Sequence, residues 1–99
     1  MLQGLILEFA GDVGREQYEA VNEVLGVDTE TGEGDWPAPL LYHAAGAKTE
    51  GWVVFEIWES QKAQEEFMGR LGPALAQVGL SAPTRVEWIE LAAHVNRES

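Results

Sequence analysis

The sequence predicts an α+β domain with the element order β-α-β-β-α-β and four strands in one antiparallel sheet. Residues 51–59, GWVVFEIWE, alternate with period two and are rich in β-branched and aromatic residues, which is the strongest strand pattern in the chain. Residues 15–25 and 61–71 repeat apolar side chains at helical spacing. A chain of 99 residues can bury one modest core, so we expect a single domain over 1–99.

The first strand is expected over 2–9 and the first helix over 15–25, where an apolar stripe comprises Tyr18, Val21, Val24 and Leu25. Gly26 follows as a helix C-cap, because glycine takes a left-handed conformation at little cost. Buried tyrosines usually pack in the core and keep the hydroxyl at its rim. We therefore expect packing, rather than catalysis, from Tyr18.

Residues 27–39 have the composition of a loop, with many acidic residues, two glycines and two closing prolines. Such long connections are unusual in a small domain and act as lids, as subunit contacts or as disordered segments. Trp36 is the one large apolar side chain in this loop, and it should dock somewhere. Plugging one end of the domain and covering a ligand are equally compatible with its position.

Residues 40–47 form the second expected strand and turn through 48–51 into the third. If Ala47 pairs with Trp52 across a four-residue loop, His43 lies directly opposite Glu56. The same register places Leu41 opposite Trp58. A slip by one residue would move every side chain to the other face, so the His43–Glu56 pair depends on this register.

Ser60 is expected to cap the second helix, which should run from Gln61 to about Leu71. Pro73 lacks a backbone donor and clashes with the preceding turn, so the helix should kink or break at Gly72-Pro73. It should resume over 74–78. The last strand is expected over 84–95, with a facing that its mixed pattern leaves open.

Right-handed connections place both helices on one face of the sheet, in the ferredoxin-like arrangement. The helix-covered face is expected to contain Leu5, Leu7, Phe9, Val53, Phe55 and Ile57. The other face is expected to contain Ile6, Glu8, Leu41, His43, Trp52, Val54, Glu56 and Trp58. Because so many large apolar side chains are not left in water, we expect a homodimer whose sheets close into a barrel, about 10 Å apart.

This chain resembles the dimeric α/β-barrel superfamily, and within it the proteins of the antibiotic-biosynthesis-monooxygenase (ABM) type. The resemblance covers nearly the whole chain in element order. It is sharpest in GWVVFEIWES at 51–60, the following helix with Phe67, and RLGPA at 70–74. It implies a barrel pocket for an aromatic, polyketide or quinol-type molecule and a cofactor-independent monooxygenase activity.

Two departures from that group bear on the activity. Haem-degrading members resemble one another in an axial His on the second helix and an Asn on the first strand, and residues 60–79 and 2–9 lack them. Members that oxidise quinols or polyketides use a Trp with polar partners. Trp52 or Trp58 could match that Trp, and Arg85 is the only nearby basic partner.

The candidate catalytic pair is His43 with Glu56, because a carboxylate beside an imidazole fixes its tautomer and favours its protonated form. The expected pocket residues are Trp52, Trp58, Tyr42 and Trp36. Deprotonation of a bound phenol there would give an electron-rich anion that reacts directly with O₂. The competing interpretation is a cross-strand ion pair at a dimer interface, which contributes about 0.2–1 kcal/mol.

Three functions therefore stay open: a monooxygenase-like enzyme, a module that holds a small apolar molecule unchanged, and a structural dimer whose barrel is filled by side chains. The net charge of −11 and scattered basic residues argue against binding to nucleic acid or an anionic membrane. The chain has no cysteine, and its two histidines lack the spacing of metal ligands. We expect no metal, no other cofactor and a cytoplasmic location.

Overall fold

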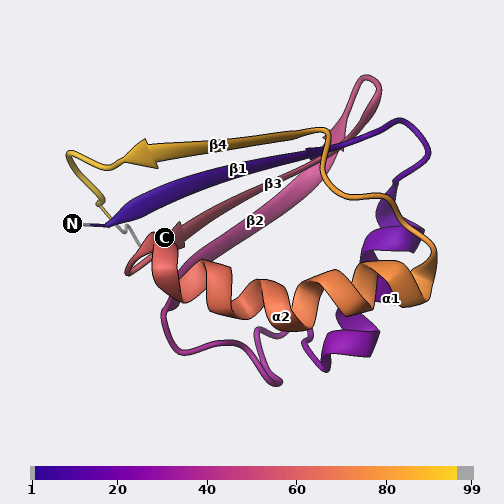
Figure 1. Ribbon diagram of the computed structural model, residues 1–99, viewed down its shortest axis with the longest axis horizontal. Helices are drawn as coiled ribbons and strands as arrows, with labels where there is room; N and C mark the ends of the chain where they lie inside the picture. Colours follow the sequence, from indigo (N-terminus) through magenta and orange to yellow (C-terminus); the bar gives the residue numbers. More distant parts are fainter. Residues whose placement is uncertain (1, 96–99) are drawn as a thin grey trace.

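The computed structural model describes residues 2–95. A four-stranded sheet forms one layer, and two helices pack against one of its faces (Figure 1). The elements in chain order are β1 (Gln3–Phe9), α1 (Arg15–Leu25), β2 (Leu40–Lys48), β3 (Gly51–Trp58), α2 (Gln61–Val78) and β4 (Arg85–Glu90). The strand order is β2-β3-β1-β4, with every pair antiparallel. This is the predicted ferredoxin-like arrangement, and the prediction is confirmed.

The pairing of the two central strands decides which side chains face the helices. Leu5 pairs with Glu56 and Leu7 with Val54, and directly paired residues project to the same face of a sheet. The face of β3 that carries Trp52, Val54, Glu56 and Trp58 therefore lies under the helices. Our expectation that Val53, Phe55 and Ile57 occupy this face was wrong. Both faces of β3 are apolar, so alternation alone did not distinguish them.

The core forms between the sheet and the helices. Its buried members are Leu5, Leu7, Phe9, Val13, Val21, Trp52, Val54, Trp58, Ala74 and Leu75. Trp58 and Leu5 are completely buried. The large indole rings of β3 thus fill the space under the helices instead of closing a barrel with a second sheet.

The β2–β3 hairpin confirms the predicted register, because His43 lies opposite Glu56 and Ala47 opposite Trp52. The register shifts between Leu40 and Tyr42, so Leu40, and not Leu41, pairs with Trp58. An extra residue of this kind is the mark of a β-bulge. Lys48 also pairs with Gly51, which shortens the expected four-residue loop to two residues.

Gly51 is required at the end of that turn. Its φ is 126°, and a Cβ atom there would lie 2.1 Å from the carbonyl oxygen of Phe9. Only glycine accepts both conditions. This tight turn fixes the register that places His43 opposite Glu56.

The second helix is continuous through Pro73, so the expected break is absent. Pro73 is exposed and costs one backbone hydrogen bond, while Ala74 and Leu75 just beyond it are buried and hold the last turns on the sheet. Both ends match expectation: the Ser60 hydroxyl accepts from Ala63 N–H at 3.1 Å, and Gly79 caps with a φ of 85°.

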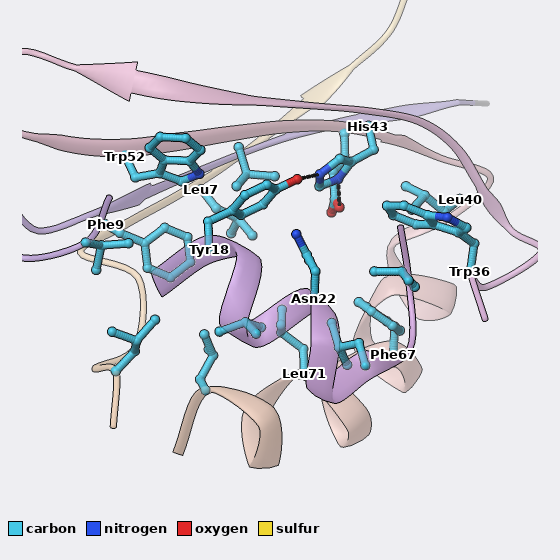
Figure 2. Close-up of a pocket in the computed structure, with 18 residues that line it drawn as sticks. Leu7, Phe9, Tyr18, Asn22, Trp36, Leu40, His43, Trp52, Phe67 and Leu71 are labelled. Carbon is cyan, nitrogen blue, oxygen red and sulfur yellow. Dashed lines mark hydrogen bonds and ion pairs between the residues drawn. The ribbon is translucent and has the colours of Figure 1, made fainter. Parts of the chain in front are cut away.

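The first helix buries a slightly different stripe from the one predicted. Val24 is 41% exposed, and Asn22 is buried in its place at 8%. Tyr18 and Asn22 are one turn apart on the side that faces the sheet (Figure 2). The last strand, β4, is shorter than expected, because residues 91–95 lie outside it. Its Trp88 packs on the core while Ile89 projects to the other side.

Candidate functional site

A small, partly enclosed cavity lies between the sheet, the two helices and the 27–39 loop (Figure 2). Its volume is about 60 Å³, which is room for a few water molecules. Its walls are mostly apolar, with Leu7, Val54 and Phe67 among them. Polar groups reach it from Tyr18, Asn22, His43 and Glu56. The cavity therefore lies within one protomer, and not in the space between two sheets where we had expected it.

His43 and Glu56 are hydrogen-bonded across the hairpin, with Nδ1 and Oε2 2.8 Å apart. The Trp58 indole N–H donates to the other carboxylate oxygen, Oε1, at 3.0 Å. Glu56 is only 6% exposed. A carboxylate is acceptor-only, so Glu56 accepts hydrogen bonds from Trp58 N–H on one side and from Nδ1–H of His43 on the other. The predicted pairing is confirmed; its catalytic role stays a prediction.

Because Nδ1 carries the proton in neutral His43, its other ring nitrogen, Nε2, is an acceptor. The Tyr18 hydroxyl forms a hydrogen bond with this Nε2. Three side chains from α1, β2 and β3 thus form one chain of hydrogen bonds, Tyr18–His43–Glu56, which Figure 2 shows at the upper wall of the cavity. The order hydroxyl, imidazole, carboxylate has the logic of a catalytic triad.

Burial raises the pKa of the Tyr18 phenol above its usual value, and the negative charge of Glu56 raises it further. The nearby amide of Asn22 acts in the opposite direction. The phenol therefore stays protonated at neutral pH. It can pass its proton to His43 only as it receives another, which suits a relay between a ligand and the imidazole.

Tyr18, for which we expected core packing, also brings its hydroxyl to the site. The phenol ring does pack, with its centroid 5.2 Å from that of Trp52, but its hydroxyl is committed to His43. One signal could have identified it. Asn22, a polar residue on the buried stripe one turn after Tyr18, indicates that this side of α1 faces something other than a purely apolar core.

The cavity wall also contains two polar atoms without partners. Among the described residues, Asn22 Nδ2 and Trp52 Nε1 are the buried side-chain nitrogen or oxygen atoms that form no hydrogen bond. Both side chains line the cavity. In Figure 2 the Asn22 amide nitrogen points into the gap between Tyr18 and the His43–Glu56 pair. Unpaired buried donors are costly in a core and call for an explanation.

Trp36 covers one side of the site. Its ring centroid lies 5.3 Å from that of His43, and its indole N–H donates to the carbonyl oxygen of Glu33 at 3.0 Å. An open groove of about 380 Å³ lies beyond it and is lined by Trp36, His43, Tyr42 and Leu40, among others. Trp36, Leu40 and His43 line both spaces, so these three side chains stand between the cavity and the groove.

The 27–39 loop that carries Trp36 is ordered by its own hydrogen bonds. The Asp28 carboxylate accepts the backbone N–H groups of Glu30 and Thr31, which lowers the pKa of Asp28. Val27 and Gly34 form a short antiparallel bridge. On α2, the Arg70 guanidinium donates to the carbonyl oxygen of Leu25 and also to Asp35. The loop is therefore a compact flap fastened to α2.

The remaining predicted residues divide into two groups. Trp52 and Trp36 line the cavity, and their contact with a ligand stays a prediction. Trp58 lies behind Glu56 and packs on Phe67, and does not line the cavity. Tyr42 is 47% exposed, packs edge-on against Phe55 on the other face of the sheet, and lines only the outer groove.

Arg85 is also remote from the cavity. It lies on the helix-free face, where it forms ion pairs with Glu8 and Glu87. Lys48 pairs with the same Glu8, and these two cations lower the pKa of that carboxyl. Arg85 is thus no partner for a pocket tryptophan.

Within residues 2–95, no group of three or more His, Cys, Asp or Glu side chains is arranged to hold a metal ion. No helix in the same range is long and apolar enough to cross a membrane.

No protein-family model matches the chain, and no curated protein matches it in sequence. Solved structures do resemble it, with TM-scores that reach 0.65. A Chloroflexus aurantiacus protein described as a candidate antibiotic biosynthesis monooxygenase has a TM-score of 0.61 and 13% identity. The match covers 96% of this chain and 98% of that one.

Two further structures share the fold. The monooxygenase ActVA-Orf6 of Streptomyces coelicolor, solved with nanaomycin D, has a TM-score of 0.57 and 18% identity, over 98% of this chain and 92% of its own. A Thermobifida fusca protein of unknown function, described as dimeric and ferredoxin-like, has a TM-score of 0.50 and 16% identity, over 93% and 90% of the two chains. The resemblance to ABM-type proteins is confirmed at the level of fold.

Proposed function

We propose that this protein is a small cofactor-independent monooxygenase that acts on a phenolic or hydroquinone-type aromatic molecule. The observation that carries the proposal is the Tyr18–His43–Glu56 chain of hydrogen bonds, which ends at a partly enclosed apolar cavity. A monooxygenase with the same fold has been solved in complex with the ligand nanaomycin D, which supports a small-molecule substrate.

The relay supplies the proton transfer that such chemistry requires. The substrate hydroxyl gives its proton to the Tyr18 oxygen as Tyr18 gives its own to His43, and Glu56 stabilises the resulting imidazolium. Moving a proton from a phenol to an imidazole costs about 5 kcal/mol at reference pKa values. That is far below the barrier of roughly 17 kcal/mol that corresponds to one turnover per second. The nearby carboxylate lowers the cost further.

The substrate anion then supplies the electrons. It passes one electron to O₂, and the two radicals combine to form a peroxide anion at an activated ring carbon. The His43 imidazolium returns its proton through Tyr18, which gives the hydroperoxide. Loss of water from that hydroperoxide leaves a ring carbonyl. One oxygen atom of O₂ enters the quinone product, the other leaves as water, and the substrate is the only reductant. A water-poor, apolar cavity favours this sequence because it limits competing proton transfers.

The size of the cavity implies that the flap must move. A volume of about 60 Å³ is too small for an aromatic substrate, since pockets for such molecules usually measure about 300–1,000 Å³. The outer groove reaches about 380 Å³. Displacement of Trp36 would join the two spaces beside His43. This assigns Trp36 the role of a lid over the substrate, which is one of the two roles considered from the sequence.

The experiment is O₂ consumption in the presence of a panel of naphthols and hydroquinones, with labelled O₂ to follow one oxygen atom into the product. Tyr18→Phe and His43→Ala should lower turnover by about 10²–10⁴-fold, the contribution of a positioned base. His94→Ala is the matched control, because His94 is exposed and lines neither the cavity nor the outer groove. Turnover that survives in the two relay variants would refute the assignment.

A second candidate function is a binding module that holds such a molecule unchanged, since the flap and the apolar walls would serve that role equally well. Retention of an aromatic molecule by the wild type and both relay variants, without O₂ consumption, would establish it in place of the enzyme.

We also propose that the helix-free face of the sheet pairs with a second copy of the chain. This face carries half-buried Ile6, Val53 and Phe55, and Ile89 is 37% exposed beside them. Exposed apolar patches of this kind mark interfaces, and one structure with this fold is described as dimeric. Phe55→Asp should give a monomer in sedimentation, whereas Val24→Asp on α1 should not. A monomeric wild type would contradict the dimer.

A further inference from the structure

Asn22 and Trp52 line the cavity, and each carries a buried N–H donor that forms no hydrogen bond within residues 2–95. Asn22 is 8% exposed and Trp52 is 4% exposed. They come from different elements, α1 and β3, and flank the Tyr18 ring from its own helix and from the sheet. We propose that these two donors form a subsite for an acceptor oxygen of the ligand, which selects hydroxyaryl ketones and hydroxyquinones over simple phenols.

The two donors select the ligand by its charge distribution. Asn22 Nδ2 and the indole Nε1 are neutral donors that cannot be deprotonated at ordinary pH. They favour an oxygen that carries partial negative charge and has no proton of its own, such as a carbonyl oxygen. A bound hydrocarbon would leave both donors unpaired and would keep their desolvation cost in the complex.

The position of the donors relative to the relay narrows the choice further. Asn22 follows Tyr18 by one helical turn, and Figure 2 shows its amide nitrogen on the side of the phenol oxygen. A ligand whose hydroxyl contacts Tyr18 would therefore present its next oxygen to Asn22 or Trp52. Rings with a hydroxyl conjugated to a carbonyl have this pattern.

The subsite also contributes to the chemistry, and this part rests on the proposed function. When the relay removes the proton of a conjugated hydroxyl, negative charge moves through the ring to the carbonyl oxygen. The N–H donor that meets that oxygen, from Asn22 or from Trp52, would stabilise the charge as it develops, as an oxyanion hole does. It would thereby lower the cost of transferring the proton to His43.

The test compares the binding of two probes of similar size, 4-hydroxyacetophenone and 4-ethylphenol. Their dissociation constants are measured by calorimetry in the absence of turnover. The wild type should prefer the ketone. Asn22→Leu and Trp52→Phe should each reduce this preference by about 3–10-fold, as expected for the loss of a hydrogen bond to an uncharged acceptor. Gln64→Leu is the matched control, since Gln64 is buried at 6% but does not line the cavity.

A second measurement separates a binding role from a structural one. If Asn22 served the fold, Asn22→Leu would lower the melting temperature. As an unpaired donor it contributes no hydrogen bond to the fold, so the melting temperature should stay unchanged or rise. A wild type with no preference for the ketone, or a preference that both variants keep, would overturn the proposal.

The ketone preference tests the subsite, and O₂ consumption tests the proposed function, so the two can fail separately. A protein that prefers the ketone through these donors but consumes no O₂ keeps the subsite and loses the enzyme. A protein that oxidises naphthols with no ketone preference keeps the enzyme and loses the subsite.

Discussion

Replacement of Glu56 by Gln should reverse the hydrogen-bond chain while leaving the fold intact. Glu56 accepts from both Trp58 Nε1 and His43 Nδ1. A glutamine has one acceptor oxygen and one donor group, so it can accept from only one of them. The buried indole N–H keeps the acceptor. The amide then donates to His43 Nδ1, which moves the histidine proton to Nε2 and makes the imidazole a donor to Tyr18.

The expected effects on stability and on turnover differ greatly in size. Two hydrogen bonds to a charged group become neutral ones, which costs about 2 kcal/mol in total, or roughly 8–16 °C in melting temperature for a domain of this length. Turnover should fall by about 10²–10⁴-fold, since His43 no longer offers an acceptor to Tyr18. Glu56→Leu, which leaves both donors unpaired, should be more destabilising, by about 3–5 kcal/mol.

The assay for the reversal is the nitrogen NMR spectrum of the His43 ring, which reports the protonated nitrogen. The wild type should carry its proton on Nδ1 and Glu56→Gln on Nε2. Glu59→Gln is the control, because Glu59 is the exposed carboxylate just beyond β3. A wild type with its proton on Nε2, or the same tautomer in both proteins, would refute the reasoning whatever the substrate is.

Three further results are expected. Because the pKa of Tyr18 is raised, the folded protein keeps the phenol proton at a pH where the unfolded chain releases it, so the free energy of unfolding should fall as pH rises through about 10. Tyr18→Phe should make this fall shallower in urea titrations. If the wild type and the variant lose stability in parallel, Tyr18 is not the cause of the fall. Arg70→Met removes the contacts of α2 with Leu25 and Asp35, so amide exchange across 28–36 should accelerate while β1 is unaffected; unchanged exchange would show that Arg70 does not fasten the flap. Ser60→Ala should lower the free energy of unfolding by about 1 kcal/mol through loss of the helix cap, and an equal loss in Ser81→Ala, at an exposed loop position, would contradict that cause.

The sequence was sufficient for the fold because the local signals agree with one another. Alternation over 51–58, the serine before α2 and the glycines after both helices each set an element or its end, and all were confirmed. The His43–Glu56 pair followed from counting across a short turn, which is a local relation.

The site was only half predictable, because the rest depends on contacts between distant segments. Tyr18 meets His43 across 25 positions of sequence, and no periodicity encodes that meeting. The same limit explains the wrong facing of β3. Both of its faces are apolar, so the choice was made by the pairing of Leu5 with Glu56 and not by the strand's own pattern. At Pro73 the prediction failed for a similar reason. The proline is a strong helix-breaking signal, but burial of its neighbours keeps α2 continuous.

The most direct test of the proposed site at Tyr18 and His43 is a crystal structure of the protein with a bound hydroxynaphthoquinone. We predict that the ligand lies between the sheet and the helices. Its hydroxyl should lie within hydrogen-bond distance of Tyr18 Oη, and Trp36 should be displaced toward the outer groove. A ligand held between the helix-free faces of two copies, away from Tyr18 and His43, would contradict it.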